Sequence, residues 1–147
     1  METKKCRECN KDYNGYYCKP CNFGHFRDNF PNWTSGDYNI DNLIQESQLD
    51  ADFLRIFLEW IKYSNLKNIE HVAEGGFAKV YKAIWKDGPI TNKKDEIKQV
   101  WYHWDVEKLE WIRRGETEVA IKKYRNATSV SSDFLNEVNK IKSDKLK

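Results

Sequence analysis

The sequence predicts an α+β protein in which a small cysteine-bearing module precedes an antiparallel sheet and a helix. All four cysteines lie within residues 6–21. Two β-prone segments flank a glycine-containing turn within residues 69–85, and a third strand at 119–124 precedes apolar residues at helical spacing. We therefore divide the chain into a module at 1–27, a connector at 28–60 and a sheet-bearing unit at 61–147.

Composition narrows the classes of protein that the chain can represent. Its 25 Lys and Arg nearly balance 23 Asp and Glu, so a net charge of +2 gives little attraction to nucleic acid or to a membrane surface. Six Trp and eight Tyr argue against disorder, because aromatic side chains bury large apolar areas on folding. No apolar run approaches the roughly 20 residues that span a bilayer, and residues 1–6 lack the apolar core of a secretion signal. We expect a folded, cytoplasmic protein whose partners are neither nucleic acid nor membrane.

The cysteines form two close pairs that stand eight residues apart. They are Cys6, Cys9, Cys18 and Cys21. Four thiolates in such pairs can close a tetrahedral shell around Zn²⁺, and a hairpin at the Asn14–Gly15 turn would bring the pairs together. A closed four-sulfur shell leaves no position for a substrate, so the predicted zinc ribbon is structural or a docking surface. His25 could replace one cysteine, although a surface position is the simpler interpretation.

Other interpretations of the cysteines remain open. Free thiols or two disulfides are alternatives, but a reducing compartment disfavours disulfides. The ribbon could instead bind nucleic acid, since residues 1–27 hold six basic side chains against three acidic ones. Four thiolates around zinc would add about two negative charges to this balance, however, which leaves little attraction for phosphates.

The connector is expected to hold one short helix that begins at Asp41. Its carboxylate can accept hydrogen bonds from the free amides of a first helical turn. One side of this helix would carry Leu43, Ile44 and Ser47. Residues 54–61 are rich in large apolar side chains and fit either a helix or a strand, so we predict only that they are buried.

The sheet-bearing unit begins with a predicted hairpin and continues into a long insertion. Strands at 69–73 and 80–85 flank the turn at 74–76. The next segment, between Lys86 and Glu116, exceeds the roughly 12 to 15 residues of an ordinary structureless loop. It contains two aromatic, β-prone stretches, which predict a Trp-rich hairpin that extends the sheet: Val100–Trp104 and Glu110–Arg113.

Two motifs in this unit point to phosphate binding. The first is Val72-Ala-Glu-Gly-Gly-Phe-Ala-Lys-Val-Tyr-Lys-Ala83, and the second is Val119-Ala-Ile-Lys122. Glycines let backbone amides approach phosphate oxygens closely, and a strand lysine presents a cation. Taken alone, each motif also fits a plain hairpin turn or a solvated lysine.

In this order, the two motifs resemble the amino-terminal lobe of eukaryotic protein kinases. With the cysteine pairs in front, the chain is similar to tyrosine-kinase-like kinases of the fungal type, which carry a zinc ribbon before the catalytic domain. The resemblance covers residues 61–147, a partial lobe with a long insertion between its second and third strands. It implies a binding site for ATP formed by Gly75, Gly76, Phe77, Val80, Ala120, Lys122 and Glu137.

The resemblance also assigns a role to each of these residues. The glycine turn would cover the triphosphate, Val80 and Ala120 would contact the two faces of adenine, and Lys122 would reach the α and β phosphates. Glu137 lies in a predicted helix capped near Asp133, which matches the kinase αC helix whose glutamate pairs with the strand lysine. The alternative for Glu137 is an ordinary exposed helix residue.

The same resemblance limits the expected chemistry. Phosphoryl transfer needs a catalytic-loop aspartate and a magnesium-binding Asp-Phe-Gly motif, and the sequence contains neither His-Arg-Asp nor Asp-Phe-Gly. We therefore expect a kinase-family fragment that binds nucleotide but does not transfer phosphate alone, with Mg²⁺ entering only in a complete kinase domain. Ala73 and Ala78 replace two glycines of the kinase pattern and favour an alternative, a non-catalytic pseudokinase module whose ribbon or Trp-rich hairpin binds a protein. A further alternative is an incomplete gene product.

Overall fold

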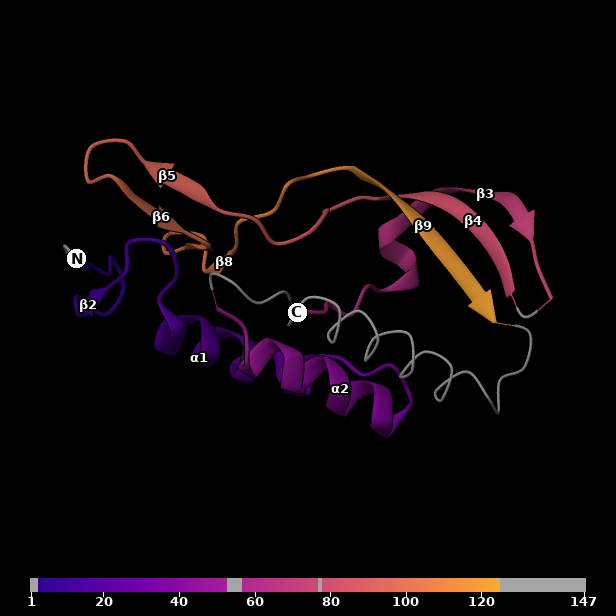
Figure 1. Ribbon diagram of the computed structural model, residues 1–147, viewed down its shortest axis with the longest axis horizontal. Helices are drawn as coiled ribbons and strands as arrows, with labels where there is room; N and C mark the ends of the chain where they lie inside the picture. Colours follow the sequence, from indigo (N-terminus) through magenta and orange to yellow (C-terminus); the bar gives the residue numbers. More distant parts are fainter. Residues whose placement is uncertain (1–2, 53–56, 77, 125–147) are drawn as a thin grey trace.

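A computed structural model of the chain describes residues 3–52, 57–76 and 78–124. The fold is α+β, as predicted, because the described helices and small antiparallel sheets occupy separate parts of the molecule (Figure 1). The helices are α1 (Lys19–Asn29) and α2 (Tyr38–Leu49), with 3-10 turns η1 (Phe30–Asn32) and η2 (Tyr63–Asn65). The strands are β1 (Lys4–Lys5), β2 (Asp12–Tyr13), β3 (Leu66–Glu74), β4 (Ala78–Trp85), β5 (Lys93–Asp95), β6 (Val100–Tyr102), β7 (Trp104–Asp105), β8 (Glu110–Trp111) and β9 (Thr117–Tyr124).

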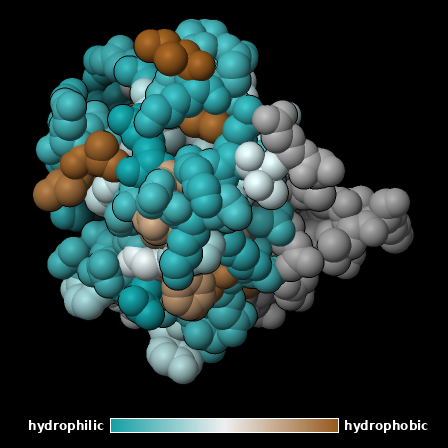
Figure 2. Space-filling view, turned by 90° about the vertical axis from the view of Figure 1, so that its left-hand side faces the viewer, coloured by the Kyte–Doolittle hydropathy of each residue, from teal (hydrophilic) through white to brown (hydrophobic). Residues whose placement is uncertain are grey.

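The molecule is elongated, and its two ends are built differently. The N-terminal module and strands β5 to β8 lie at one end, the sheet of β3, β4 and β9 lies at the other, and the described helices run along one side (Figure 1). Seen from the module end, the surface is largely hydrophilic, with apolar spots that are separate from one another (Figure 2). Among the described helices, none has the length and apolar character needed to cross a membrane.

The N-terminal hairpin differs from the predicted one in the position of its turn. Strands β1 and β2 pair antiparallel, and the turn between them is residues 6–11, which contains the first cysteine pair. Asn14 and Gly15 form a separate turn, in which the Asn14 side-chain oxygen accepts hydrogen bonds from the N–H groups of Tyr16 and Tyr17. The prediction of a hairpin at Asn14–Gly15 was therefore wrong, because the asparagine bonds its own downstream backbone and leads the chain into α1.

Helix α2 begins earlier than predicted. Asp37 is its N-cap and accepts hydrogen bonds from the next free amides of the helix, at 2.8 and 3.2 Å. The predicted cap, Asp41, lies inside the first turn, where its carboxylate accepts hydrogen bonds from residues 34–35, which lower its pKa. The predicted inner face is confirmed, since α2 buries Leu43, Ile44 and Ser47.

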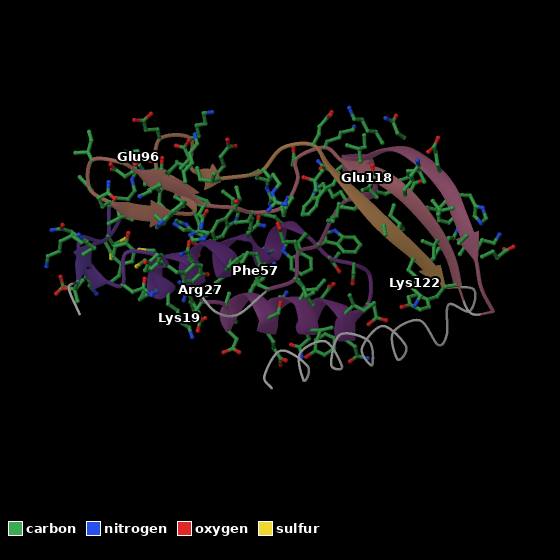
Figure 3. The ribbon with its side chains drawn as sticks, turned by 45° about the horizontal axis from the view of Figure 1, so that its top comes forward. Lys19, Arg27, Phe57, Glu96, Glu118 and Lys122 are labelled. Carbon is green, nitrogen blue, oxygen red and sulfur yellow. The ribbon has the colours of Figure 1, made fainter. Side chains whose placement is uncertain are left out.

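The apolar segment predicted at 54–61 falls partly outside the described residues, which resume at Phe57. Residues 57–61 form neither a helix nor a strand. Their backbone is held by α2, because the N–H of Leu58 donates to Ser47 Oγ at 2.9 Å and its carbonyl accepts from Gln48 Nε2 at 2.9 Å. Phe57 lies between the helical layer and the insertion (Figure 3), 5.1 Å from the Phe26 ring, whereas Trp60 is 38% exposed. Phe57 is therefore half-buried against the core, and the burial predicted for Trp60 is wrong.

The predicted strands of the sheet form and pair as expected. Strand β4 is central, and β3 and β9 both pair with it antiparallel. In the ladder between β4 and β9, Val80 lies opposite Lys122 and Lys82 lies opposite Ala120. The turn between β3 and β4 is closed by a hydrogen bond from Gly75 N to Ala78 O at 2.9 Å.

The insertion between β4 and β9 forms two hairpins instead of one. Strand β7 pairs with β8, which confirms the Trp-rich hairpin, but β6 pairs with β5. In the described part of the chain, these four strands pair only among themselves, so the prediction that they extend the main sheet was wrong. The physical reason is that their aromatic side chains find apolar partners on α1, as the ring of Trp111 does 4.5 Å from that of Phe26.

A short two-stranded neck, residues 87–91 and 112–115, joins the insertion to the sheet. Three backbone hydrogen bonds of 2.9 to 3.0 Å cross it. Gly88 adopts a φ of +70°, and a Cβ at this position would lie 2.0 Å from the carbonyl oxygen of Gly115. The neck therefore requires glycine at 88, because a side chain would strain the backbone and collide with the opposite strand.

Candidate functional site

The four cysteine sulfurs gather at one point of the N-terminal module. All of them lie within 4.8 Å of one another, and the pairs Cys6–Cys21 and Cys9–Cys18 are each 3.9 Å apart. A zinc–sulfur bond of about 2.3 Å in a tetrahedral shell gives sulfur–sulfur distances of about 3.8 Å. A disulfide would need about 2.05 Å, so these cysteines are not disulfide-bonded and the disulfide alternative is wrong. The cluster is close enough to hold one metal ion and is compatible with structural zinc.

Two different local structures position the sulfurs. The first pair sits in the β1–β2 turn, where the N–H of Glu8 donates to Cys6 Sγ at 3.4 Å and Asn10 adopts a φ of +59° to close the turn. The second pair sits at the start of α1, with Cys18 as the N-cap and Cys21 in the first turn. The amino-terminal end of a helix carries a partial positive charge, which favours thiolates at this place.

Hydrogen bonding and burial shift the pKa values of the cluster thiols in opposite directions. A hydrogen bond from the Lys11 backbone lowers the pKa of the Cys9 thiol. Burial raises the pKa of Cys18 to about 11 and also raises the pKa of Cys21. A divalent metal would displace the protons of these thiols by stabilising the thiolates.

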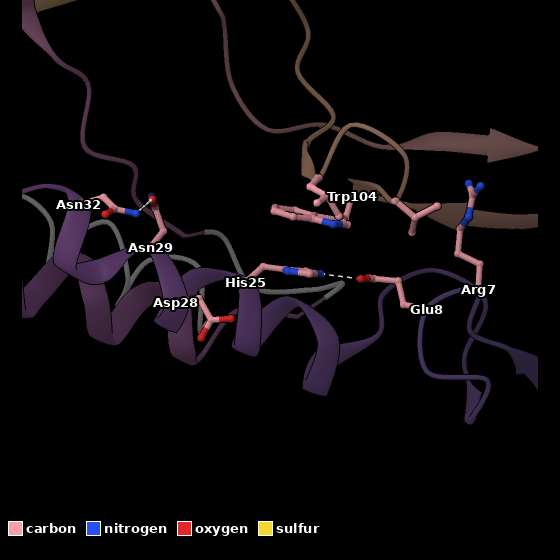
Figure 4. A pocket seen from close by; sticks show the side chains of 9 residues that line it. Arg7, Glu8, His25, Asp28, Asn29, Asn32 and Trp104 are labelled. Carbon is pink, nitrogen blue, oxygen red and sulfur yellow. Dashed lines mark hydrogen bonds and ion pairs between the residues drawn. The ribbon is translucent and has the colours of Figure 1, made fainter.

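His25 lies beside the cluster without joining it. Its Nε2 is 2.6 Å from Glu8 Oε1, and its ring stacks on that of Trp104 with centroids 3.7 Å apart (Figure 4). The side chains of His25 and Glu8 are each only 21% exposed. His25 is thus not part of the cysteine cluster, and it lies partly exposed at the edge of a cavity. The ring is held by a carboxylate on one edge and an indole on one face, because the insertion covers it.

Three of the seven residues predicted to bind nucleotide share one face of the sheet. Directly opposite residues of an antiparallel pair project to the same side, and so do residues two apart. Val80, Ala120 and Lys122 therefore share one face. The glycine turn is at the same end of the sheet as Lys122, which Figure 3 shows near the end of β9, with its Nζ 5.4 Å from the Tyr124 ring centroid. Phe77 and Glu137 lie outside the described residues.

The turn glycines and the neighbouring alanines differ in how much space surrounds them. A Cβ at Gly76 would meet nothing within 4 Å, and a Cβ at Gly75 would meet only Ala78 O at 3.8 Å; neither residue has a positive φ. The hairpin itself does not require glycine at these two positions. Ala73 pairs with Val80, and Ala78 lies two residues before Val80 in β4, so both methyl groups are on that face; Ala78 is buried.

The sequence did not reveal that the insertion docks on the cysteine module. Trp101 and Trp104 of the insertion both contact this module, and a cavity of ≈ 590 Å³ opens beside Trp104 and His25. The only signal in the sequence was the unusual number of tryptophans in an insertion otherwise rich in charge. Comparison of the chain with protein-family models, with curated proteins and with solved structures finds no match.

Proposed function

We propose that the N-terminal module binds one structural zinc ion through Cys6, Cys9, Cys18 and Cys21. The observation that carries this proposal is the pair of 3.9 Å sulfur–sulfur distances within a cluster that spans no more than 4.8 Å. Four sulfur ligands fill a tetrahedral shell, so the ion supplies folding energy and no open position for a substrate.

Metal analysis tests this proposal directly. Protein purified without chelator is expected to contain one zinc ion per chain, and Cys9→Ser is expected to lower this content strongly. Lys19→Ala is the matched control, because Lys19 is an exposed residue between the two cysteines of the second pair. Less than about half a zinc ion per chain in the wild type would count against the proposal.

We further propose that the sheet of β3, β4 and β9 binds the phosphates of ATP as part of a kinase-like lobe. The supporting observation is that Val80, Ala120 and Lys122 share one face at the end of the sheet that carries the glycine turn. The open space around Gly75 and Gly76 also supports it, because glycines that the hairpin does not need leave room for close approach of phosphate. Lys122 would supply the positive charge.

Neighbouring lysines provide a sharp test of the nucleotide site. Lys122 and Lys123 are adjacent exposed residues of β9 that project to opposite faces of the sheet. ATP is expected to raise the melting temperature of the wild type and of Lys123→Ala but not of Lys122→Ala. An equal shift in both variants, or none in the wild type, would contradict the proposal.

A non-catalytic, pseudokinase-like role is the second candidate, and one observation favours it. The Ala73 methyl group lies on the same face as Val80, where the kinase pattern has glycine. In either case we expect no phosphoryl transfer by the chain alone. Incubation with magnesium, labelled ATP and a generic protein substrate tests this, and turnover that Lys122→Ala removes would overturn it.

A further inference from the structure

The insertion is attached to the cysteine module by backbone hydrogen bonds. The N–H of Trp101 donates to Gly15 O at 2.7 Å, and its carbonyl accepts from Tyr13 Oη at 3.1 Å. Gly15 is buried and has a φ of +84°, so its carbonyl is presented to the insertion by a backbone shape that favours glycine. Residues more than eighty positions apart in the sequence are thus joined through both backbone polar groups of Trp101.

The side chains that complete this contact come from inside the first cysteine pair. Arg7 and Glu8 are the two residues between Cys6 and Cys9. The guanidinium carbon of Arg7 lies 4.1 Å from the Tyr102 ring centroid, a cation–π contact, and Glu8 holds the histidine that stacks on Trp104. Both residues of the metal-binding turn therefore touch the insertion, directly or through one partner.

The insertion also lies next to the sulfur cluster itself. A cavity of ≈ 20 Å³, large enough for about one water molecule, is lined by Cys6 and Cys18 on one side and by Trp101 and His103 on the other. The His103 ring is 5.1 Å from that of Tyr17 and faces it edge-on. The insertion thus covers one side of the cluster that would hold the ion.

The module has little else to fix the shape of this turn. Strands β1 and β2 have two residues each, and an isolated two-stranded hairpin is marginally stable in water. The described apolar core, Tyr17, Phe26 and Ala51, lies after the hairpin in the sequence. A metal ion that binds both cysteines of the turn and both cysteines of α1 would therefore set the positions of Arg7 and Glu8.

We propose that metal binding latches the insertion, residues 86–116, onto the cysteine module. The inference rests on the proposed zinc site and adds a consequence to it: the ion orders the turn that holds Tyr102 and Trp104, and its loss releases them. By linkage, the docked insertion strengthens metal binding by the same factor by which the metal strengthens docking. The zinc centre then acts as a switch for the exposure of the Trp-rich hairpins.

Hydrogen exchange of the whole chain, with zinc and after chelation, tests the latch. Amides of residues 93–113 are expected to exchange about tenfold faster without metal, while those of β3 and β4 stay unchanged. Zinc bound to the wild type with no change in exchange at 93–113 after its removal would overturn the latch and leave the zinc site standing. A wild type that binds no zinc would instead overturn the zinc site, and the latch with it.

Variants at the contact between the insertion and the cysteine module test the reciprocal effect on zinc affinity. Trp104→Ala removes the stack on His25. Arg7→Ala removes the cation–π contact with Tyr102 from an exposed side chain, so it tests the latch even if the first variant does not fold. Both are expected to weaken zinc affinity about threefold to tenfold at unchanged stoichiometry. Ile97→Ala is the matched control, because Ile97 lies in the β5–β6 turn and is 95% exposed. If Trp104→Ala and Arg7→Ala both bind zinc with the affinity of Ile97→Ala, the latch is overturned.

Discussion

The two ends of the molecule obtain their geometry from different interactions. At the sheet end, backbone ladders fix which residues are opposite one another; the ladder between β4 and β9 is continuous, and the one between β3 and β4 has two register shifts. At the module end, strands of two or three residues contribute little, and single contacts such as the stack of His25 on Trp104 fix the arrangement. Figure 3 shows how far apart these regions are, with Glu96 near one end and Lys122 near the other.

The two ends should therefore differ in how well they tolerate the loss of a single contact. A backbone ladder shares its stability among many similar hydrogen bonds, so removal of one side chain changes it little. An arrangement fixed by a few point contacts fails when one of them is lost, especially where a single ion would bind four ligands. The module end should therefore be sensitive to single substitutions and to chelation, and the sheet end should not.

Loss of one metal ligand is expected to have the largest effect on this comparison. Cys9→Ser should remove the structural ion and destabilise the module by on the order of 5 kcal/mol or more, since structural zinc contributes folding energy directly. The sheet should keep its protection. Limited proteolysis followed by mass spectrometry measures this, with new cleavage expected within residues 3–29. Cleavage that appears equally in β3 and β4 would show that the two ends unfold together.

The neck between the two ends should be the next most sensitive place. Gly88→Ala is expected to cost at least about 2 kcal/mol, because Gly88 has a φ of +70° and a Cβ would lie 2.0 Å from Gly115 O. Gly24→Ala is the control, since a Cβ at Gly24 meets nothing within 4 Å. The measurement is the urea midpoint of each variant. Equal midpoints would mean that the neck relaxes without cost.

The contrast between the ends also explains what the sequence could predict. The strands of the sheet are set by local apolar patterns and a glycine turn, and the cysteine spacing alone indicated the metal cluster. The start of α2 was missed because Asp37 and Asp41 are both good caps, and the choice depends on the contacts of residues 34–35. The docking of Trp101 and Trp104 could not be predicted, because their partners, Gly15 and His25, lie far away in the sequence. Strand periodicity gives no signal for such isolated long-range contacts.

A substitution in the glycine turn separates stability from binding at the sheet end. Gly76→Ala is expected to change the free energy of unfolding by less than about 0.5 kcal/mol, because the added methyl group meets nothing within 4 Å. If the turn covers phosphate, ATP affinity should nevertheless fall severalfold, since the methyl group obstructs close approach of the backbone amide. Calorimetric titration with ATP and a melting curve measure the two effects. A large loss of stability would contradict this view of the turn.

Protonation of two aspartates in the hairpin turns should produce the smallest effect, and this effect should be confined to the insertion. The turns of the two hairpins have the same hydrogen-bond pattern. Asp95 and Asp105 each accept hydrogen bonds from the backbone N–H groups two and three residues ahead, at 2.9 to 3.1 Å. These bonds, foremost those from Lys98 and Lys108, lower the pKa of each aspartate. Because the folded pKa values lie below the ordinary one, the carboxylates stabilise the turns above the ordinary aspartate pKa of about 3.9 and lose this effect as the pH falls through the folded values.

The matching experiment compares variants of the two turns across that pH range. Asp95→Asn and Asp105→Asn remove the titrating carboxylate but keep an oxygen that accepts both hydrogen bonds. Amide exchange in the turns of the wild type, corrected for its intrinsic pH dependence, should lose protection as the pH falls below about 4, and the asparagine variants should lack this step. A step that persists in the double variant would assign the acid sensitivity to other groups, and the insertion would then respond to pH through its attachment to the module.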